Sequence, residues 1–124
     1  MARLSRTLIV AVPLLVASLA LSSCGVGAGV ADARASCVHV KKALALQARS
    51  ADTGISSSES ATLQASALNQ LLRGTQDAAN ATTADGSWNA LQTTISEAQR
   101  VPLGDLVPAL TRLCNVADST TPYL

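Results

Sequence analysis

Apolar side chains recur at intervals of three and four residues in four successive stretches between residues 33 and 118, and this spacing constrains the fold more than any other feature of the chain. Such spacing places the apolar side chains on one face of an α-helix, whereas a half-buried strand needs alternation at every second residue. The composition agrees, because alanine, a strong helix former, makes up about a fifth of the chain and phenylalanine is absent. We therefore predict an all-α fold.

The first predicted helix runs over residues 33–50, and Asp52, Thr53 and Gly54 end it. Its apolar stripe comprises Val30, Ala33, Cys37, Val40, Leu44 and Ala48.

The second predicted helix is the most clearly amphipathic and continues to about residue 81. It begins at Ser56, and Glu59 three residues later completes a capping-box pattern. Gly74 lies on its apolar side, which predicts a close approach of a neighbouring helix or a bend. The apolar arc comprises Leu63, Ala67, Leu68, Leu71, Leu72, Ala78 and Ala79.

Two shorter helices are predicted to follow. The third is capped near Asp85 or Ser87, and its stripe comprises Trp88, Leu91, Ile95 and Ala98. We expect the fourth to take Asp105 as its N-cap, because Pro108 then falls in the first turn, where a missing amide hydrogen is no loss. Its apolar face comprises Leu106, Val107, Leu110, Leu113, Cys114 and Ala117.

The start of the chain has the pattern of an export signal. Arg3 and Arg6 precede an apolar run over residues 8–21, which is shorter than the roughly twenty residues that a membrane-spanning helix needs. Leu21, Ser22, Ser23 and Cys24 follow directly, and here the chain resembles the bacterial lipoproteins, whose lipobox has an aliphatic residue, two small residues and cysteine. The resemblance covers only the first 24 residues. It implies a diacylglyceryl group on the sulfur of Cys24 and cleavage after Ser23.

The alternative is an ordinary secretory signal, cut after a site such as Ala33-Arg34-Ala35, which lies well beyond the apolar run.

The cysteine count agrees with lipid attachment. If Cys24 carries lipid, Cys37 and Cys114 remain as a pair in an oxidising compartment. These two residues lie near the start of the first helix and near the end of the last. In an up-and-down bundle these ends are neighbours only if the number of helices is even. We therefore predict an up-and-down four-helix bundle with one structural disulfide; a redox switch is the less favoured interpretation.

These features divide the chain into four parts. Residues 1–23 form the removed signal peptide, residues 24–31 the lipidated cysteine and a flexible tether, residues 32–118 the bundle, and residues 119–124 a disordered tail. Removing Arg3 and Arg6 leaves seven basic against eight acidic residues, a formal net charge of −1. This charge argues against a nucleic-acid partner.

Catalytic and metal-binding patterns are weak. His39 is the only histidine, and residues two apart on a helix point in nearly opposite directions, so Cys37 and His39 do not converge on one metal ion. We interpret His39 as a surface residue beside Lys42. The carboxylates are scattered, and no phosphate loop or nucleophile elbow is present. We therefore expect no catalytic residues, metal or cofactor.

The candidate contact surface consists of four cations on one flank of the first helix, Arg34, Lys41, Lys42 and Arg49. They suit anionic lipid headgroups, although a solvated face that keeps the domain soluble is the favoured interpretation. Leu46 points away from the main stripe and is a possible partner contact. Trp88 is expected in the core rather than in a ligand pocket.

The predicted function is that of a lipid-anchored extracytoplasmic membrane protein, acting as a non-catalytic binding or structural module of the cell envelope with an unknown protein partner. The alternative is a small carrier or chaperone for a lipid or other apolar ligand, which needs a cavity inside the bundle. An enzyme needs a cleft with perturbed titratable groups.

Overall fold

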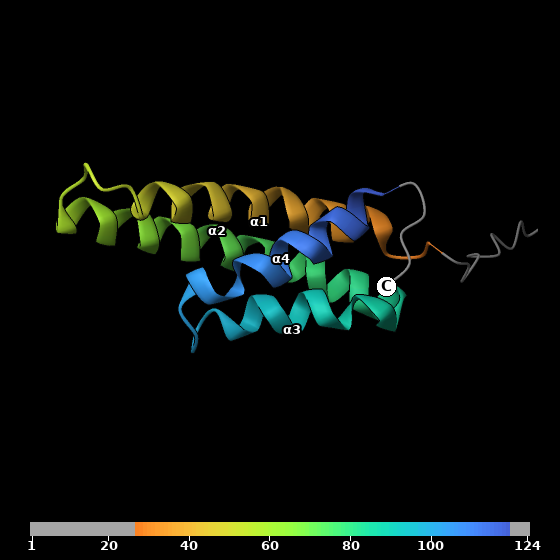
Figure 1. Ribbon diagram of the computed structural model, residues 1–124. Helices are drawn as coiled ribbons and strands as arrows, with labels where there is room; N and C mark the ends of the chain where they lie inside the picture. The colour runs from red at the N-terminus through yellow and green to blue at the C-terminus, as the bar shows by residue number, and fades with distance from the viewer. Residues whose placement is uncertain (1–26, 120–124) are drawn as a thin grey trace, which may run out of the picture.

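The computed structural model describes residues 27–119, which fold into four α-helices joined by short connections (Figure 1). Each helix packs against the next in the chain, and the last returns to the first. The described part of the chain is therefore the all-α, up-and-down four-helix bundle that the periodicity predicts. The elements are α1 (Val30–Ser50), α2 (Ser57–Ala84), the 3₁₀ turn η1 (Gly86–Trp88), α3 (Asn89–Glu97) and α4 (Leu103–Asp118).

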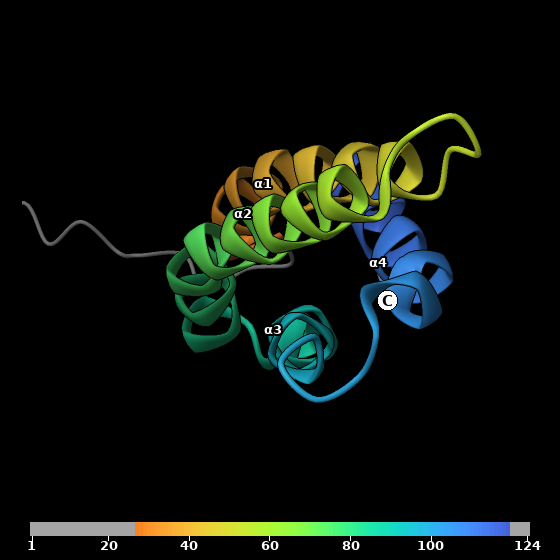
Figure 2. The same cartoon turned by 90° about the vertical axis from the view of Figure 1, so that its left-hand side faces the viewer.

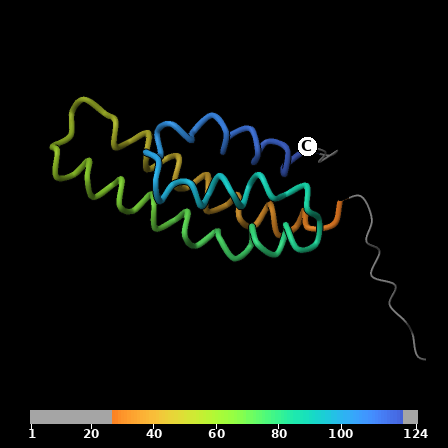
Figure 3. Tube along the Cα trace, turned by 90° about the horizontal axis from the view of Figure 1, so that it is seen from below, coloured from red at the N-terminus to blue at the C-terminus, as the bar shows by residue number. Residues whose placement is uncertain are grey.

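The four helices differ in length. At a rise of 1.5 Å per residue, α1 and α2 are about 32 Å and 42 Å long, whereas α4 is about 24 Å and α3 is shorter still. The α1–α2 hairpin therefore projects beyond the other two helices (Figures 1 and 3). Nearly all residues of the projecting tip are exposed. Seen along the bundle, α3 and α4 lie on one side of this hairpin (Figure 2).

The core is built mainly from small and medium side chains around one tryptophan. Trp88 is 1% exposed, and its indole N–H donates a hydrogen bond to the carbonyl of Ala28 at 3.2 Å. This confirms the prediction that Trp88 belongs to the core. The largest buried aliphatic side chains come from all four helices and are Leu71, Leu91, Ile95, Leu110 and Val40.

Helices α1 and α2 approach each other closely at Gly74. The Ser36 hydroxyl donates to the Gly74 carbonyl at 2.9 Å, and both residues are buried. A Cβ atom at position 74 would lie 3.1 Å from the Ser36 carbonyl oxygen and 3.3 Å from the His39 Cβ. Gly74 therefore allows the close approach of a neighbouring helix, which is one of the two roles predicted for it; the other was a bend.

The start of α1 differs from its predicted position. The helix begins at Val30, so the last two residues of the predicted tether over residues 24–31 belong to α1. The bundle therefore starts before residue 32. The reason is tertiary contact that composition does not reveal. Gly29 has a φ of 76°, and a Cβ there would lie 2.6 Å from the Ala81 carbonyl oxygen. Together with the Trp88–Ala28 hydrogen bond, this contact packs the segment against the end of α2.

The start of α4 also differs from the prediction. The helix begins at Leu103 with Pro102 as N-cap, so Asp105 is not the cap but lies in the first turn, where a negative charge is favourable. Pro108 consequently lies inside the helix and removes the amide that would bond to the Gly104 carbonyl. Gly104 is exposed, so solvent is available to that carbonyl.

The other helix starts agree with the sequence. The Ser56 hydroxyl accepts a hydrogen bond from the Glu59 amide at 3.2 Å, which confirms Ser56 as the N-cap of α2. The Asp85 carboxylate accepts from the Ser87 amide at 3.0 Å and caps η1. Two residues at the edges of the predicted apolar faces are exposed: Ala48, and Leu72, which is 49% exposed and lies 100° around α2 from the buried Leu71.

Replacing Gly74 tests the close approach of α1 and α2. Alanine improves helix propensity by about 1 kcal/mol, but its Cβ meets the Ser36 backbone, which has little freedom to move. We expect Gly74→Ala to lower the free energy of unfolding by about 1 kcal/mol and Gly74→Val by about 3 kcal/mol in denaturant titrations. Gly54→Ala is the control, because a Cβ there meets nothing within 4 Å. Equal stability of all three variants would contradict a tight contact.

Candidate functional site

The predicted disulfide joins the first helix to the last. Cys37 of α1 and Cys114 of α4 are bonded across a sequence separation of 77 residues, with their Cα atoms 5.5 Å apart. Both residues are buried, which fits the structural role predicted for the bond. Cys24, the predicted lipidation site, lies outside the described residues.

Two of the four predicted surface cations are bound to the end of α4. The Arg34 guanidinium donates to the carbonyl of Ala117 at 2.7 Å and to that of Ser119 at 3.1 Å. The Lys41 ammonium forms an ion pair with Asp118. The last carbonyls of a helix lack partners within the helix and carry partial negative charge, so a cation here caps α4.

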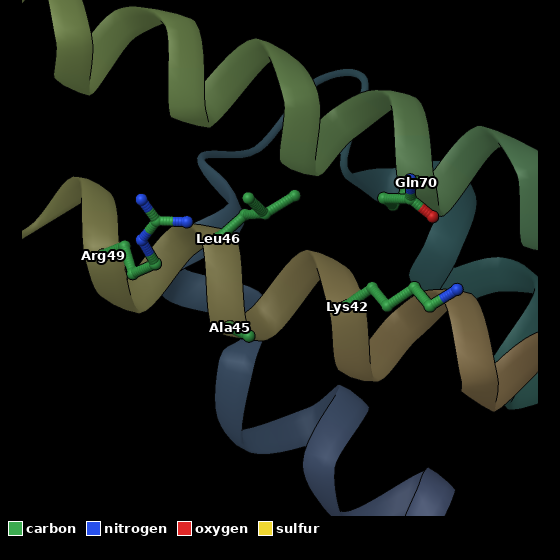
Figure 4. Close-up of a pocket in the computed structure, with 5 residues that line it drawn as sticks. All are labelled: Lys42, Ala45, Leu46, Arg49 and Gln70. Carbon is green, nitrogen blue, oxygen red and sulfur yellow. The ribbon is translucent and has the colours of Figure 1, made fainter.

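The other two cations line an open groove between α1 and α2 (Figure 4). Lys42 and Arg49 flank Leu46 along α1, and Gln70 faces them from α2. With Ala45, these residues line a groove volume of about 310 Å³. None of the five lining side chains is acidic. Leu46, predicted to point away from the main stripe, is half-buried, lines this groove and also packs against the core.

His39 is half-buried rather than on the surface as predicted. Its Nδ1 is hydrogen-bonded to the Gln70 side-chain oxygen at 3.2 Å, so His39 and the groove share Gln70. Sequence reasoning did not identify Gln70, because its role depends on how α2 packs against α1.

A second groove of about 260 Å³ lies between the α1–α2 hairpin and the α3–α4 connection. Gln47 and Gln64 come from the hairpin, and Val101, Pro102 and Leu103 from the connection. Both grooves open to the surface, and Trp88 lines neither of them.

Three acidic side chains have local structural roles. Asp85 caps η1, Glu97 pairs with Arg100, and Asp118 pairs with Lys41. Across residues 27–119 there is no cluster of three or more side chains suited to hold a metal ion. None of the described helices combines the length and apolar character required to cross a bilayer.

Comparisons of the chain with protein-family models, with curated proteins and with solved structures find no match.

Single substitutions test whether the cations bound to α4 contribute more to stability than the cations of the groove. Arg34→Gln removes a charged donor from two carbonyls of α4, so we expect the free energy of unfolding to fall by about 1 to 2 kcal/mol. Lys42→Gln is the matched control and should change it by less than about 0.5 kcal/mol. Chemical denaturation of both variants makes the comparison. Equal losses of unfolding free energy in the two variants would contradict the conclusion that Arg34 is bound to α4 and Lys42 is not.

Loss of the disulfide should be the largest single change. Cys37→Ala combined with Cys114→Ala opens a 77-residue loop, and chain entropy then predicts a loss of about 4 kcal/mol. Thermal unfolding should show a lower Tm, and reducing agent should lower the Tm of the parent but not that of the double variant. A parent Tm unaffected by complete reduction would contradict this prediction.

Proposed function

We propose that the protein is a lipid-anchored extracytoplasmic lipoprotein of the cell membrane, and that its bundle is a non-catalytic binding or structural module of the cell envelope. The observation that carries the proposal is the pairing of the cysteines. Cys37 and Cys114 bond to each other, which accounts for two of the three cysteines of the chain, and Cys24 is the third. That residue also ends the lipobox-like sequence.

The compartment implied by the disulfide supports the same proposal. Disulfides persist in proteins exposed to oxidising surroundings and are uncommon in the reducing cytosol. The signal-like leader and the disulfide are separate features, and both favour export. A diacyl group supplies two acyl chains, which suffice for stable anchoring where one chain does not.

The distribution of side chains supports a binding or structural role. In the described residues Asp85 caps a helical turn, Glu97 and Asp118 form ion pairs, and His39 of α1 is hydrogen-bonded to Gln70 of α2. Acid–base catalysis needs titratable groups that converge on a cleft. The two surface grooves have no acidic side chain in their linings, which favours contact with a partner over chemistry.

Replacing the proposed lipidation site tests the anchor. Cys24→Ala should abolish incorporation of labelled fatty acid and move the protein out of the membrane fraction and the detergent phase. The matched control is Cys37→Ala combined with Cys114→Ala, which removes two other cysteines and should retain the label. Undiminished lipid labelling of Cys24→Ala would refute the anchor.

A further inference from the structure

We propose that the groove between Lys42 and Arg49 binds the phosphate headgroup of an anionic phospholipid in the membrane that carries the anchor. This inference rests on the proposed function and adds to it a ligand, a site and an orientation of the bundle.

The first support is the division of the four cations. Arg34 and Lys41 are engaged with Ala117, Asp118 and Ser119 at the end of α4. No ion pair within residues 27–119 includes Lys42 or Arg49. The charge of these two cations is therefore available to an outside anion.

The second support is the chemistry of the groove. Leu46 and Ala45 supply an apolar surface between the two cations, and Gln70 adds an amide on the opposite wall (Figure 4). A headgroup phosphate requires positive charge and hydrogen-bond donors, while the glycerol and first methylenes of the lipid require apolar contact. Because none of the lining residues is acidic, nothing in the lining opposes an anion.

The third support is the place of the groove relative to the anchor. Gly27, the first described residue, is three residues after Cys24, a separation that an extended chain spans in about 10 Å. Helix α1 starts at Val30 and carries both cations. Arg49 is 19 residues along α1 from Val30, about 28 Å at helical rise. For both cations to reach headgroups, α1 must lie along the membrane surface.

The outer side of α1 suits this orientation. Apart from Lys41 and Lys42, the exposed residues of α1 between Arg34 and Arg49 are small or apolar and comprise Ala35, Val38, Ala45 and Ala48. Asp32, the only acidic residue of α1, is in its first turn. The surface that would face the headgroups thus has little negative charge of its own.

Amine footprinting tests the inference, because Lys41 and Lys42 are the only lysines of the chain. The lipid-modified full chain is reconstituted into vesicles of phosphatidylcholine, with or without phosphatidylglycerol. Brief acetylation followed by mass spectrometry then gives the reactivity of each lysine. We expect Lys42 to react about fivefold more slowly in the anionic vesicles, the factor that one near-surface charge contributes, while Lys41 changes much less. Equal reactivity of Lys42 in both vesicles overturns the inference.

Two variants and a free anion sharpen the result. Arg49→Gln should remove most of the protection of Lys42, whereas Arg112→Gln, which removes an exposed cation from α4, should keep it. Loss of protection in both variants would indicate a general charge effect and would overturn the site. Inorganic phosphate added to phosphatidylcholine vesicles should leave Lys42 reactive; equal protection by phosphate would show a soluble anion as the ligand and overturn the lipid assignment.

Flotation of the vesicles separates failure of the site from failure of the anchor. Protein that floats with both kinds of vesicle but shows no protection of Lys42 retains the anchor and lacks the site. Protein that floats only with anionic vesicles supports the site and refutes the anchor. Protein that floats with neither overturns both proposals.

Discussion

The bundle depends on the closure of its first helix against its last. Three side chains of α1 make this closure from one stripe, at spacings of three and four residues: Arg34, Cys37 and Lys41. They engage the end of α4 through hydrogen bonds to Ala117 and Ser119, through the disulfide to Cys114, and through the ion pair with Asp118. Because α1 and α4 are the two outermost helices in the sequence, this contact holds together everything between them.

Small residues set the rest of the packing. Gly74 brings α2 against Ser36, and Gly29 brings the start of α1 against Ala81. With six alanines among the buried apolar residues and no phenylalanine in the chain, the helices gain stability from close backbone approach more than from large side chains. A core of this kind buries modest apolar area, which gives the covalent link a large share of the net stability.

The sequence predicted those features that depend on local pattern. Helical periodicity gave four helices, the Ser56 cap follows from Glu59 three residues later, and the cysteine count led to the disulfide. The predicted start of α4 is wrong, because the prediction places Pro108 in the first turn of the helix. Pro108 lies deeper inside α4, where the carbonyl that loses its hydrogen bond belongs to Gly104, which is exposed to solvent.

The candidate surface was predictable only in part. Helical spacing places four cations on one flank of α1, but it does not show which of them bind α4 and which remain in the groove. Arg34 and Lys41 differ from Lys42 and Arg49 through residues that lie about seventy or more positions away on α4. Gln70 became part of the groove through the packing of two helices. No pattern within a single helix encodes either relation. The same holds for the segment before α1, where the glycine-rich composition predicts flexibility and the contact of Gly29 with Ala81 of α2 depends on packing.

The hydrogen bond from Trp88 to Ala28 gives the molecule a built-in optical reporter. The chain has one tryptophan, and its indole is held by the segment that leads from the proposed anchor into the bundle. Indole emission therefore reports on this junction rather than on an average of many sites. Detachment of Ala28 would remove the hydrogen-bond partner of the indole N–H, so the emission of Trp88 reports whether the segment before α1 is still held against the bundle.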